Sequence, residues 1–278
     1  MQHLSSAVEA FESIQNLAQD ATLVDRRLGL GVCLAGDRAS CARFQVFGTY
    51  FGSLDAFNAT IKAAILSRLP EPASATASAV DWLASLQLLA DSPLREEVPL
   101  CKKATANFYA TSVTSPEAFS RRALEAFFQY VIHDSSEYRT SWFSIINLHG
   151  GPDSQIGQRS SCLSVPRDAL WVAQHFGHAK NGVEFPEDGI RFVQGLRNAM
   201  TKHMPRHGAC LSYVDPEMPA DEAHKMVSRV ICSFPLSCVG IRTDTDGHKY
   251  YGEDATIKLK RIKAEIDAGN TFCSPQSI

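Results

Sequence analysis

Two polar side chains stand in otherwise apolar strand patterns, where residue type and spacing together could support chemistry. In residues 170–176, LWVAQHF, the two-residue period of a strand puts Gln174 on the same face as three apolar side chains. In residues 209–215, ACLSYVD, the same period puts the phenol of Tyr213 on a mainly apolar face. An unpaired buried amide costs about 1–3 kcal/mol, so Gln174 must bond either the backbone or a ligand. Tyr213 has the same two options, a local partner for its hydroxyl or a functional site.

The histidines offer a second kind of chemistry, metal binding. They include two closely spaced pairs, His175 with His178 and His203 with His207. The second pair is four residues apart at a predicted helix end, which would place both imidazoles on one face. No Glu follows His203 as in the HExxH motif of zinc enzymes, and Pro205 interrupts the helix. We therefore favour solvated helix-end histidines and expect no bound metal.

Two glycine-containing stretches resemble motifs of other activities, but neither fits its motif in full. Residues 29–31, GLG, with Gly36 resemble a dinucleotide-binding loop, but the third glycine is misplaced and all lie inside a predicted strand. Residues 149–151, HGG, resemble the oxyanion loop of esterases, but the chain contains no G-x-S-x-G nucleophile motif. We expect neither a nucleotide loop nor an esterase site.

Composition narrows the possible partners. The chain has 278 residues, of which 45% are hydrophobic and 21% charged, and its net charge of -3 gives no electrostatic reason to bind nucleic acid or an anionic membrane. No apolar run approaches the roughly 20 residues that span a bilayer. We therefore expect no nucleic acid and no membrane as partner.

Three features bear on the compartment, which the sequence leaves unassigned. Eight cysteines without a CxxC pair argue against a zinc ribbon and are compatible with thiols or disulfides. The N-terminus predicts an amphipathic helix and lacks the apolar core and cleavage site of a signal peptide. Asn58-Ala59-Thr60 is a glycosylation sequon, which matters only in a secreted protein.

The elements that must position these residues alternate between strands and helices. Patterns predict strands at 28–36 and 43–52 as a hairpin, and further strands at 106–114, 141–151, 162–166, 169–176 and 209–215. Helices are predicted at 54–69, at 82–89, from Pro116 onward and at 186–203. Many neighbouring strands lack room for crossover helices. This favours an α+β fold, an antiparallel sheet with helices on one face.

The chain ends with YYGEDATIKLKRIKAEIDAGNTFCSPQSI, a pattern that is typical of an ordered segment rather than of a disordered tail. A predicted helix carries an apolar stripe, Gly269-Asn270 supplies a stop, and an apolar tail follows. The stripe consists of Ala255, Leu259, Ile262 and Ile266. Such an ending is typical of a segment that docks on another surface.

This ending resembles the C-terminal signature of the berberine-bridge-enzyme-like flavoproteins, with an aromatic-Tyr-Gly turn, an L..IK helix, Asp-x-x-Asn-x-Phe and a Pro-Gln-Ser-Ile tail. Upstream, ACLSYVDPEM is similar to that family's Ala-Tyr-x-Asn-Tyr-x-Asp strand. SWFSIINLHGG and VPRDALWVAQHF resemble its apolar strand before a Gly-Gly turn and its Arg-containing strand with a Gln facing the flavin. The fungal members of the family are the most similar.

The resemblance implies an FAD-dependent oxidoreductase built of two domains. An N-terminal domain would hold FAD, and an α+β substrate domain would cover the isoalloxazine. We expect residues 1–205 to be the substrate-binding domain and residues 206–278 a C-terminal segment that packs on the FAD domain. That FAD domain is missing from this sequence, so the partner of the exposed face would be an FAD-binding domain or a second copy.

The resemblance also assigns roles to single residues. Tyr213 matches the tyrosine near the flavin that helps to deprotonate a substrate hydroxyl, and Gln174 matches a polar residue facing the substrate. Ser212 stands where the family usually has Asn, so Ser212 and Tyr213 are the expected contacts to the flavin. The implied reaction oxidises an alcohol or related C–H centre of a secondary metabolite or sugar by hydride transfer to flavin. A tyrosine with a pKa near 10 would need activation by a neighbour to act as a base.

The sequence departs from the family in ways that leave an alternative open. Ala268 replaces a usual Pro, and residues 226–247 form an apolar, cysteine-bearing insertion or a retained intron. The alternative function is a truncated, non-catalytic remnant or binding module that is unable to hold FAD. A histidine-based metal hydrolase ranks below both.

Overall fold

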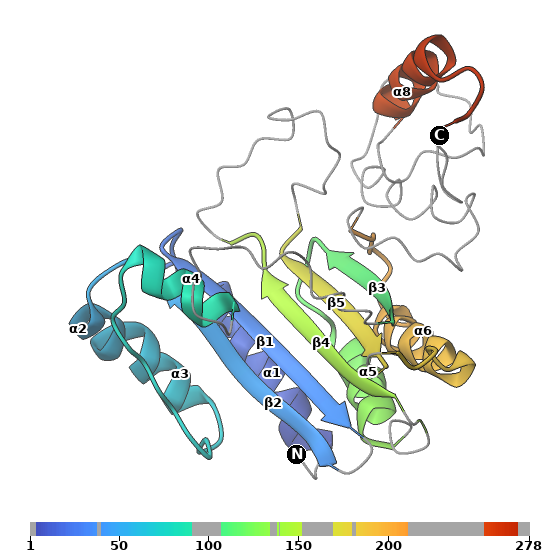
Figure 1. Cartoon of the computed structure of the whole chain (residues 1–278). Helices are drawn as coiled ribbons and strands as arrows, with labels where there is room; N and C mark the ends of the chain where they lie inside the picture. Colours follow the sequence, from blue (N-terminus) through green and yellow to red (C-terminus); the bar gives the residue numbers. More distant parts are fainter. Residues whose placement is uncertain are drawn as a thin grey trace, which may run out of the picture.

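The computed structural model describes residues 4–37, 40–90, 107–133, 138, 140–151, 169–179, 182–210 and 253–271 (Figure 1). Its strands are β1 (Leu28–Asp37), β2 (Ser40–Tyr50), β3 (Phe108–Ser115), β4 (Ser141–Leu148) and β5 (Trp171–His178). Its longer helices are α1 (Leu4–Ala18), α4 (Trp82–Ala90), α5 (Arg121–His133), α6 (Glu187–Thr201) and α8 (Glu253–Ile266). No helix among the described residues is long and apolar enough to cross a membrane.

One five-stranded sheet, in the order β2-β1-β4-β5-β3, organises the described part of the chain. Every neighbouring pair of strands is antiparallel. The predicted hairpin is confirmed, because β1 pairs with β2 from Leu28 opposite Tyr50 to Ala35 opposite Arg43. The expected α+β class is confirmed as well. The strand expected at 162–166 and most of that expected at 209–215 lie outside the described residues.

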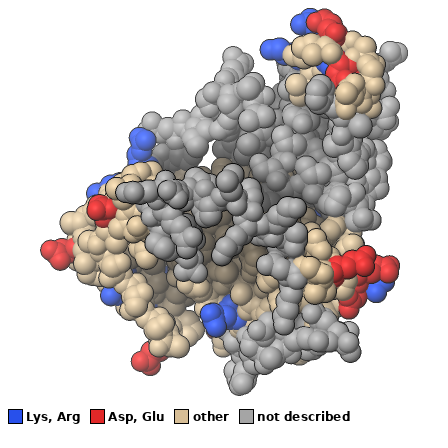
Figure 2. All heavy atoms as spheres, in the orientation of Figure 1, with Lys and Arg blue, Asp and Glu red and all other residues tan. Residues whose placement is uncertain are grey.

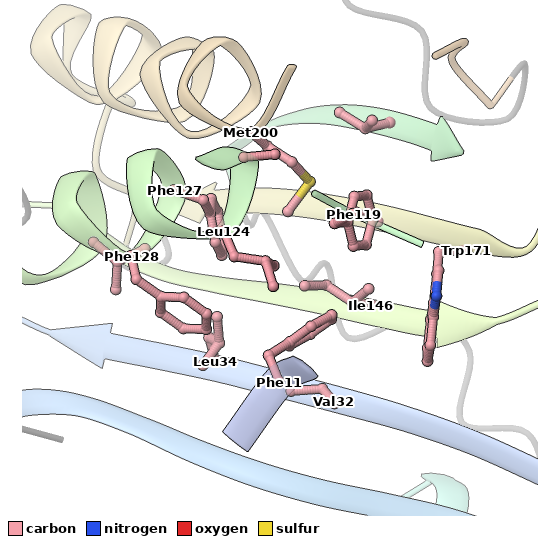
Figure 3. Close-up of a cluster of buried hydrophobic side chains, with 14 of the residues drawn as sticks. Phe11, Val32, Leu34, Phe119, Leu124, Phe127, Phe128, Ile146, Trp171 and Met200 are labelled. Atoms are coloured by element: carbon pink, nitrogen blue, oxygen red, sulfur yellow. The ribbon is translucent and has the colours of Figure 1, made fainter. Parts of the chain in front are cut away.

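Helices α1, α5 and α6 cover one face of this sheet and form the core with it (Figure 3). The alternation of β5 shows which face they cover, because Trp171, Ala173 and His175 are all fully buried. Phe11 of α1 packs against the indole of Trp171 and the ring of Phe119, with ring centroids 5.9 Å apart in each pair. The helix-covered face is therefore a closed aromatic core.

A buried glutamine fixes α1 to the loop that precedes α5. The Gln15 Nε2 donates to the Phe119 carbonyl at 3.1 Å, and the Gln15 Oε1 accepts from the Phe119 N–H at 2.7 Å. Gln15 is only 3% exposed. Since both amide atoms bond one backbone unit 104 residues away, the side chain acts as a buried clamp.

The helix predicted at 54–69 is present as three consecutive pieces: α2 (Leu54–Phe57), a π-helical turn (Asn58–Lys62) and α3 (Ala63–Arg68). The helix predicted to open at Pro116 begins later, at Arg121. The reason is the side chain of Ser120, whose Oγ accepts the Ala123 N–H at 3.2 Å and caps the helix there. The predicted start at Pro116 was wrong, because residues 116–120 precede the helix.

The predicted C-terminal helix is confirmed as α8 (Glu253–Ile266). Its stop lies where the glycine-asparagine pair predicted it, because Asn270 has a φ of 53°, in the left-handed region. On the predicted stripe, Leu259 and Ile262 are half-buried, whereas Ile266 is 79% exposed. The docking of this helix on another domain stays a prediction.

Candidate functional site

The side of the sheet that points away from α1, α5 and α6, called the open face below, carries the candidate site. Figure 1 shows the strands in front of α1 and α5, with this face towards the viewer. The central strands β4 and β5 present half-buried or buried side chains that are uncharged at neutral pH: Phe143, Ile145, Asn147, Val172, Gln174 and Phe176. Among the described atoms visible in Figure 2, charged groups lie mainly around the rim of the view.

Gln174 belongs to a row of residues that crosses all five strands. The pairing register aligns Gln45, Cys33, Ile145, Gln174 and Ser112 in that order. Its predicted strand face is confirmed, since Val172 and Phe176 share it. The structure records no hydrogen bond between the Gln174 amide and any other described residue. The side chain is half-buried and lies between Val172 and Phe176 on its strand face.

Ser112 joins the end of this row to the segment that leads towards Tyr213. Its Oγ accepts the Cys210 N–H at 2.8 Å. Two residues earlier, Gly208 and Thr114 exchange backbone hydrogen bonds of 2.8 and 2.9 Å. The chain therefore runs alongside β3 as far as Cys210. Ser212 and Tyr213 themselves lie outside the described residues, so their predicted contacts stay predictions.

An aromatic group flanks one side of the row. The rings of Phe143 and Phe176 stack at 4.8 Å between centroids, with 14° between their planes. Phe108 lies 5.9 Å from the ring of Phe176, and the imidazole of His178 lies 6.1 Å from the ring of Phe143. These rings offer a flat, weakly polar surface beside the Gln174 amide.

A bare glycine flanks the other side of the row. A Cβ placed on Gly31 would lie 2.5 Å from Cζ of Phe47 and 2.7 Å from Oδ1 of Asn147. The glycine thus allows a phenyl ring and an amide to approach the strand backbone closely. Gly29, Gly31 and Gly36 all lie inside β1, as expected, rather than in a loop between a strand and a helix.

The described histidines do not converge as their spacing suggested. His175 lies on the helix-covered face with Nδ1 2.8 Å from Oγ of Ser144, whereas His178 is exposed on the open face. His203 is exposed, and Nδ1 of His207 lies 2.9 Å from the carbonyl oxygen of Met204. In the described ranges no three His, Cys, Asp or Glu side chains gather into a metal-binding group.

Sequence reasoning missed the buried Ser144–His175 pair. Burial, assisted by the charge of Arg197, lowers the pKa of His175 to about 3, so the imidazole is neutral at ordinary pH. The strand period could have indicated the burial of His175, because neighbouring residues of a strand point to opposite faces and Gln174 points to the open face. Cys33 was also missed. Its half-burial raises the pKa of its thiol, and the charge of Arg43 acts in the opposite direction. Cys33 is the member of the row that β1 contributes.

Residues 214–278 match the family described as berberine and berberine like. The resemblance inferred from the tail is therefore confirmed. The boundary after residue 205 and the nature of residues 226–247 stay predictions.

Comparison with known proteins extends the likeness over the described fold. The carbohydrate oxidase of Microdochium nivale is 24% identical over 280 residues, covering 99% of this chain and 50% of the relative. Its structure with a substrate analogue has a TM-score of 0.74 at 22% identity, covering 100% of this chain and 53% of that one.

Two further oxidases share the fold. A chitooligosaccharide oxidase has a TM-score of 0.77 at 20% identity, covering 99% of this chain and 52% of that one. A glucooligosaccharide oxidase of Acremonium strictum, which carries a 6-S-cysteinyl, 8α-N1-histidyl FAD, has a TM-score of 0.71 at 21% identity, covering 99% and 53%. At these identities the likeness establishes the fold. The chain spans half or less of the length of the curated relatives it matches.

Proposed function

We propose that this chain forms the substrate-binding half of an FAD-dependent oxidoreductase that oxidises a hydroxyl group of an oligosaccharide. The observation that carries the proposal is the central part of the open face, where β4 and β5 present uncharged side chains and where the amide of Gln174 bonds no other described residue. The names of the relatives, oxidases of carbohydrates and oligosaccharides, support the substrate class.

The open face fits a carbohydrate in both of its chemical aspects. The C–H faces of a sugar ring pack against flat apolar surfaces, which the stacked Phe143 and Phe176 provide. Sugar hydroxyls need donors and acceptors, which the amides of Gln174 and Asn147 provide. Ligand sites of this mixed character, apolar with a few convergent polar groups, are typical of small-molecule recognition.

The same face fits one part of FAD and not the other. A flat, neutral isoalloxazine is compatible with the half-buried, uncharged side chains that β4 and β5 present on this face. The diphosphate of FAD requires a cradle of backbone N–H groups, and the described residues contain no glycine-rich turn at the start of a helix. We therefore assign this chain the side of the site that faces the substrate, with Ser212 and Tyr213 as its contacts to the flavin.

The proposed reaction divides the work between cofactor and chain. FAD, when bound, supplies the acceptor for the hydride that leaves the sugar carbon. Tyr213 takes the proton from the same hydroxyl at its phenolic oxygen, and a neighbouring charge or hydrogen bond must lower its pKa for this role. Gln174 orients the sugar through its amide, and the aromatic group keeps water away from the reacting carbon.

Flavin absorption after mixing the chain with FAD and desalting tests this function. We expect retained flavin bands, which chito-, xylo- or glucooligosaccharides bleach under anaerobic conditions. Tyr213→Phe should keep the flavin and slow the bleaching step. Gln174→Leu should raise the sugar concentration needed for half-maximal rate. Gln45→Leu, at the far edge of the same row, serves as the matched control and should change neither value.

Two results would count against the proposal. If no flavin is retained, the chain does not hold FAD by itself, which favours the alternative of a binding module that is unable to hold FAD. If flavin is retained but no oligosaccharide bleaches it, the assigned substrate class is wrong.

A further inference from the structure

The tripeptide Asn58-Ala59-Thr60 is the one N-x-S/T sequence in the chain, and its position in the fold exposes it. It lies in the π-helical turn between α2 and α3, which Figure 1 shows to one side of the sheet. All three of its residues are exposed, whereas the next residue, Ile61, is 2% exposed and points inward. The segment therefore presents the tripeptide to solvent while its neighbours anchor it.

The side chain of Asn58 is free to be modified without loss of a contact. The structure records no hydrogen bond from its amide group to any other described residue, and its backbone N–H bonds Leu54 and Asp55 within the helix. The segment with Asn58 follows β2 in the chain, whereas Gln174 lies on β5, which β1 and β4 separate from β2 in the sheet.

We propose that Asn58 is an acceptor for an N-linked glycan when the chain passes through the endoplasmic reticulum. The donor is an oligosaccharide attached to a lipid through a diphosphate. A bond forms between Nδ2 of Asn58 and C1 of the first sugar, and the bond between C1 and the diphosphate oxygen breaks. The lipid diphosphate leaves with the electron pair, one amide proton passes to a base of the transferase, and nothing is oxidised or reduced.

The folded structure also indicates when this step takes place. Oγ1 of Thr60 donates to the carbonyl oxygen of Ala56 at 2.6 Å, so the hydroxyl of the sequon is already engaged in the helical turn. A transferase that needs this hydroxyl must act before the turn forms. Modification is therefore expected on the emerging chain, and the folded, unmodified protein is expected to be a poor acceptor.

The test is the intact mass of the full chain secreted from yeast behind a removable leader. We expect one N-linked glycan, released by peptide N-glycosidase with conversion of residue 58 to aspartate. Asn58→Gln and Thr60→Ala should each abolish the modification, and Thr60→Ser should retain it. All of these positions are exposed, so the variants should fold like the parent.

Two results would overturn the proposal. The first is a secreted parent chain whose residue 58 remains unmodified asparagine. The second is an N-linked mass that persists in Asn58→Gln. Neither result depends on flavin or sugar oxidation, so this proposal and the proposed function fail separately.

Discussion

His175 makes the stability of this protein depend on pH in a way that can be calculated. Its side chain is completely buried beneath the helices, with Nδ1 2.8 Å from Oγ of Ser144 and its ring 5.7 Å from that of Phe127. Burial is the main cause of its low pKa, about 3, and the positive charge of Arg197 adds to it. Between about pH 3 and pH 6.5 the imidazole is therefore neutral in the folded protein, whereas that of an unfolded chain carries a proton.

The sign and size of the effect follow from this difference. The unfolded chain has a histidine pKa of about 6.5, so below that pH the unfolded state binds more protons than the folded state. The stability contribution is complete above pH 6.5 and is lost as the pH falls from 6.5 towards 3. Between pH 8 and pH 5 the free energy of unfolding should drop by about 2 kcal/mol through this residue alone.

Urea unfolding followed by circular dichroism at several pH values between 8 and 5 measures this loss. His175→Gln cannot take up a proton, so it should flatten the pH dependence by about the calculated amount, whatever it does to stability at pH 8. His203→Gln, at an exposed position, is the matched control and should leave the dependence unchanged. Equal pH dependence in the parent and in His175→Gln would refute the reasoning.

Other predictions address the Gln15 clamp, the glycine at position 31 and the hydrogen bond between Ser112 and Cys210. Gln15→Leu leaves two buried backbone groups unpaired and should cost about 2–4 kcal/mol in urea unfolding, whereas the exposed Gln19→Leu should stay within about 0.5 kcal/mol. Gly31→Ala should cost about 1–3 kcal/mol through overlap with a phenyl ring and an amide and should weaken sugar binding in calorimetry. Gly29→Ala, whose added Cβ has its nearest neighbour at 3.8 Å, should do neither. Ser112→Ala should cost about 1 kcal/mol and slow sugar-dependent flavin bleaching, because the segment leading to the proposed base loses its anchor.

Much of the fold could be predicted because its patterns are local. Alternating apolar residues predicted the hairpin of β1 and β2, and the same period put Gln174 on its observed face. The start of α5 was missed because proline and Ser120 offer competing helix starts, and the side-chain cap decided between them.

Contacts between distant segments could not be predicted from local patterns. Ser112 and Cys210 are 98 residues apart in sequence, and the bridge between Thr114 and Gly208 holds their segments side by side. The Ser144–His175 contact likewise depends on the register between β4 and β5, which no single strand encodes. The alignment of these residues into one row across the open face could therefore be found only from the strand pairing in the structure.

The central claim is that oligosaccharides bind on the open face beside Gln174. Backbone amide shifts of the isotope-labelled chain, titrated with chito-, xylo- and glucooligosaccharides in the presence of FAD, test it most directly. The account predicts shifts that centre on Ser112, Ile145 and Gln174 and weaken in Gln174→Leu. Shifts confined to α1 and α5 behind the sheet, or no shifts with any of these sugars, would contradict it.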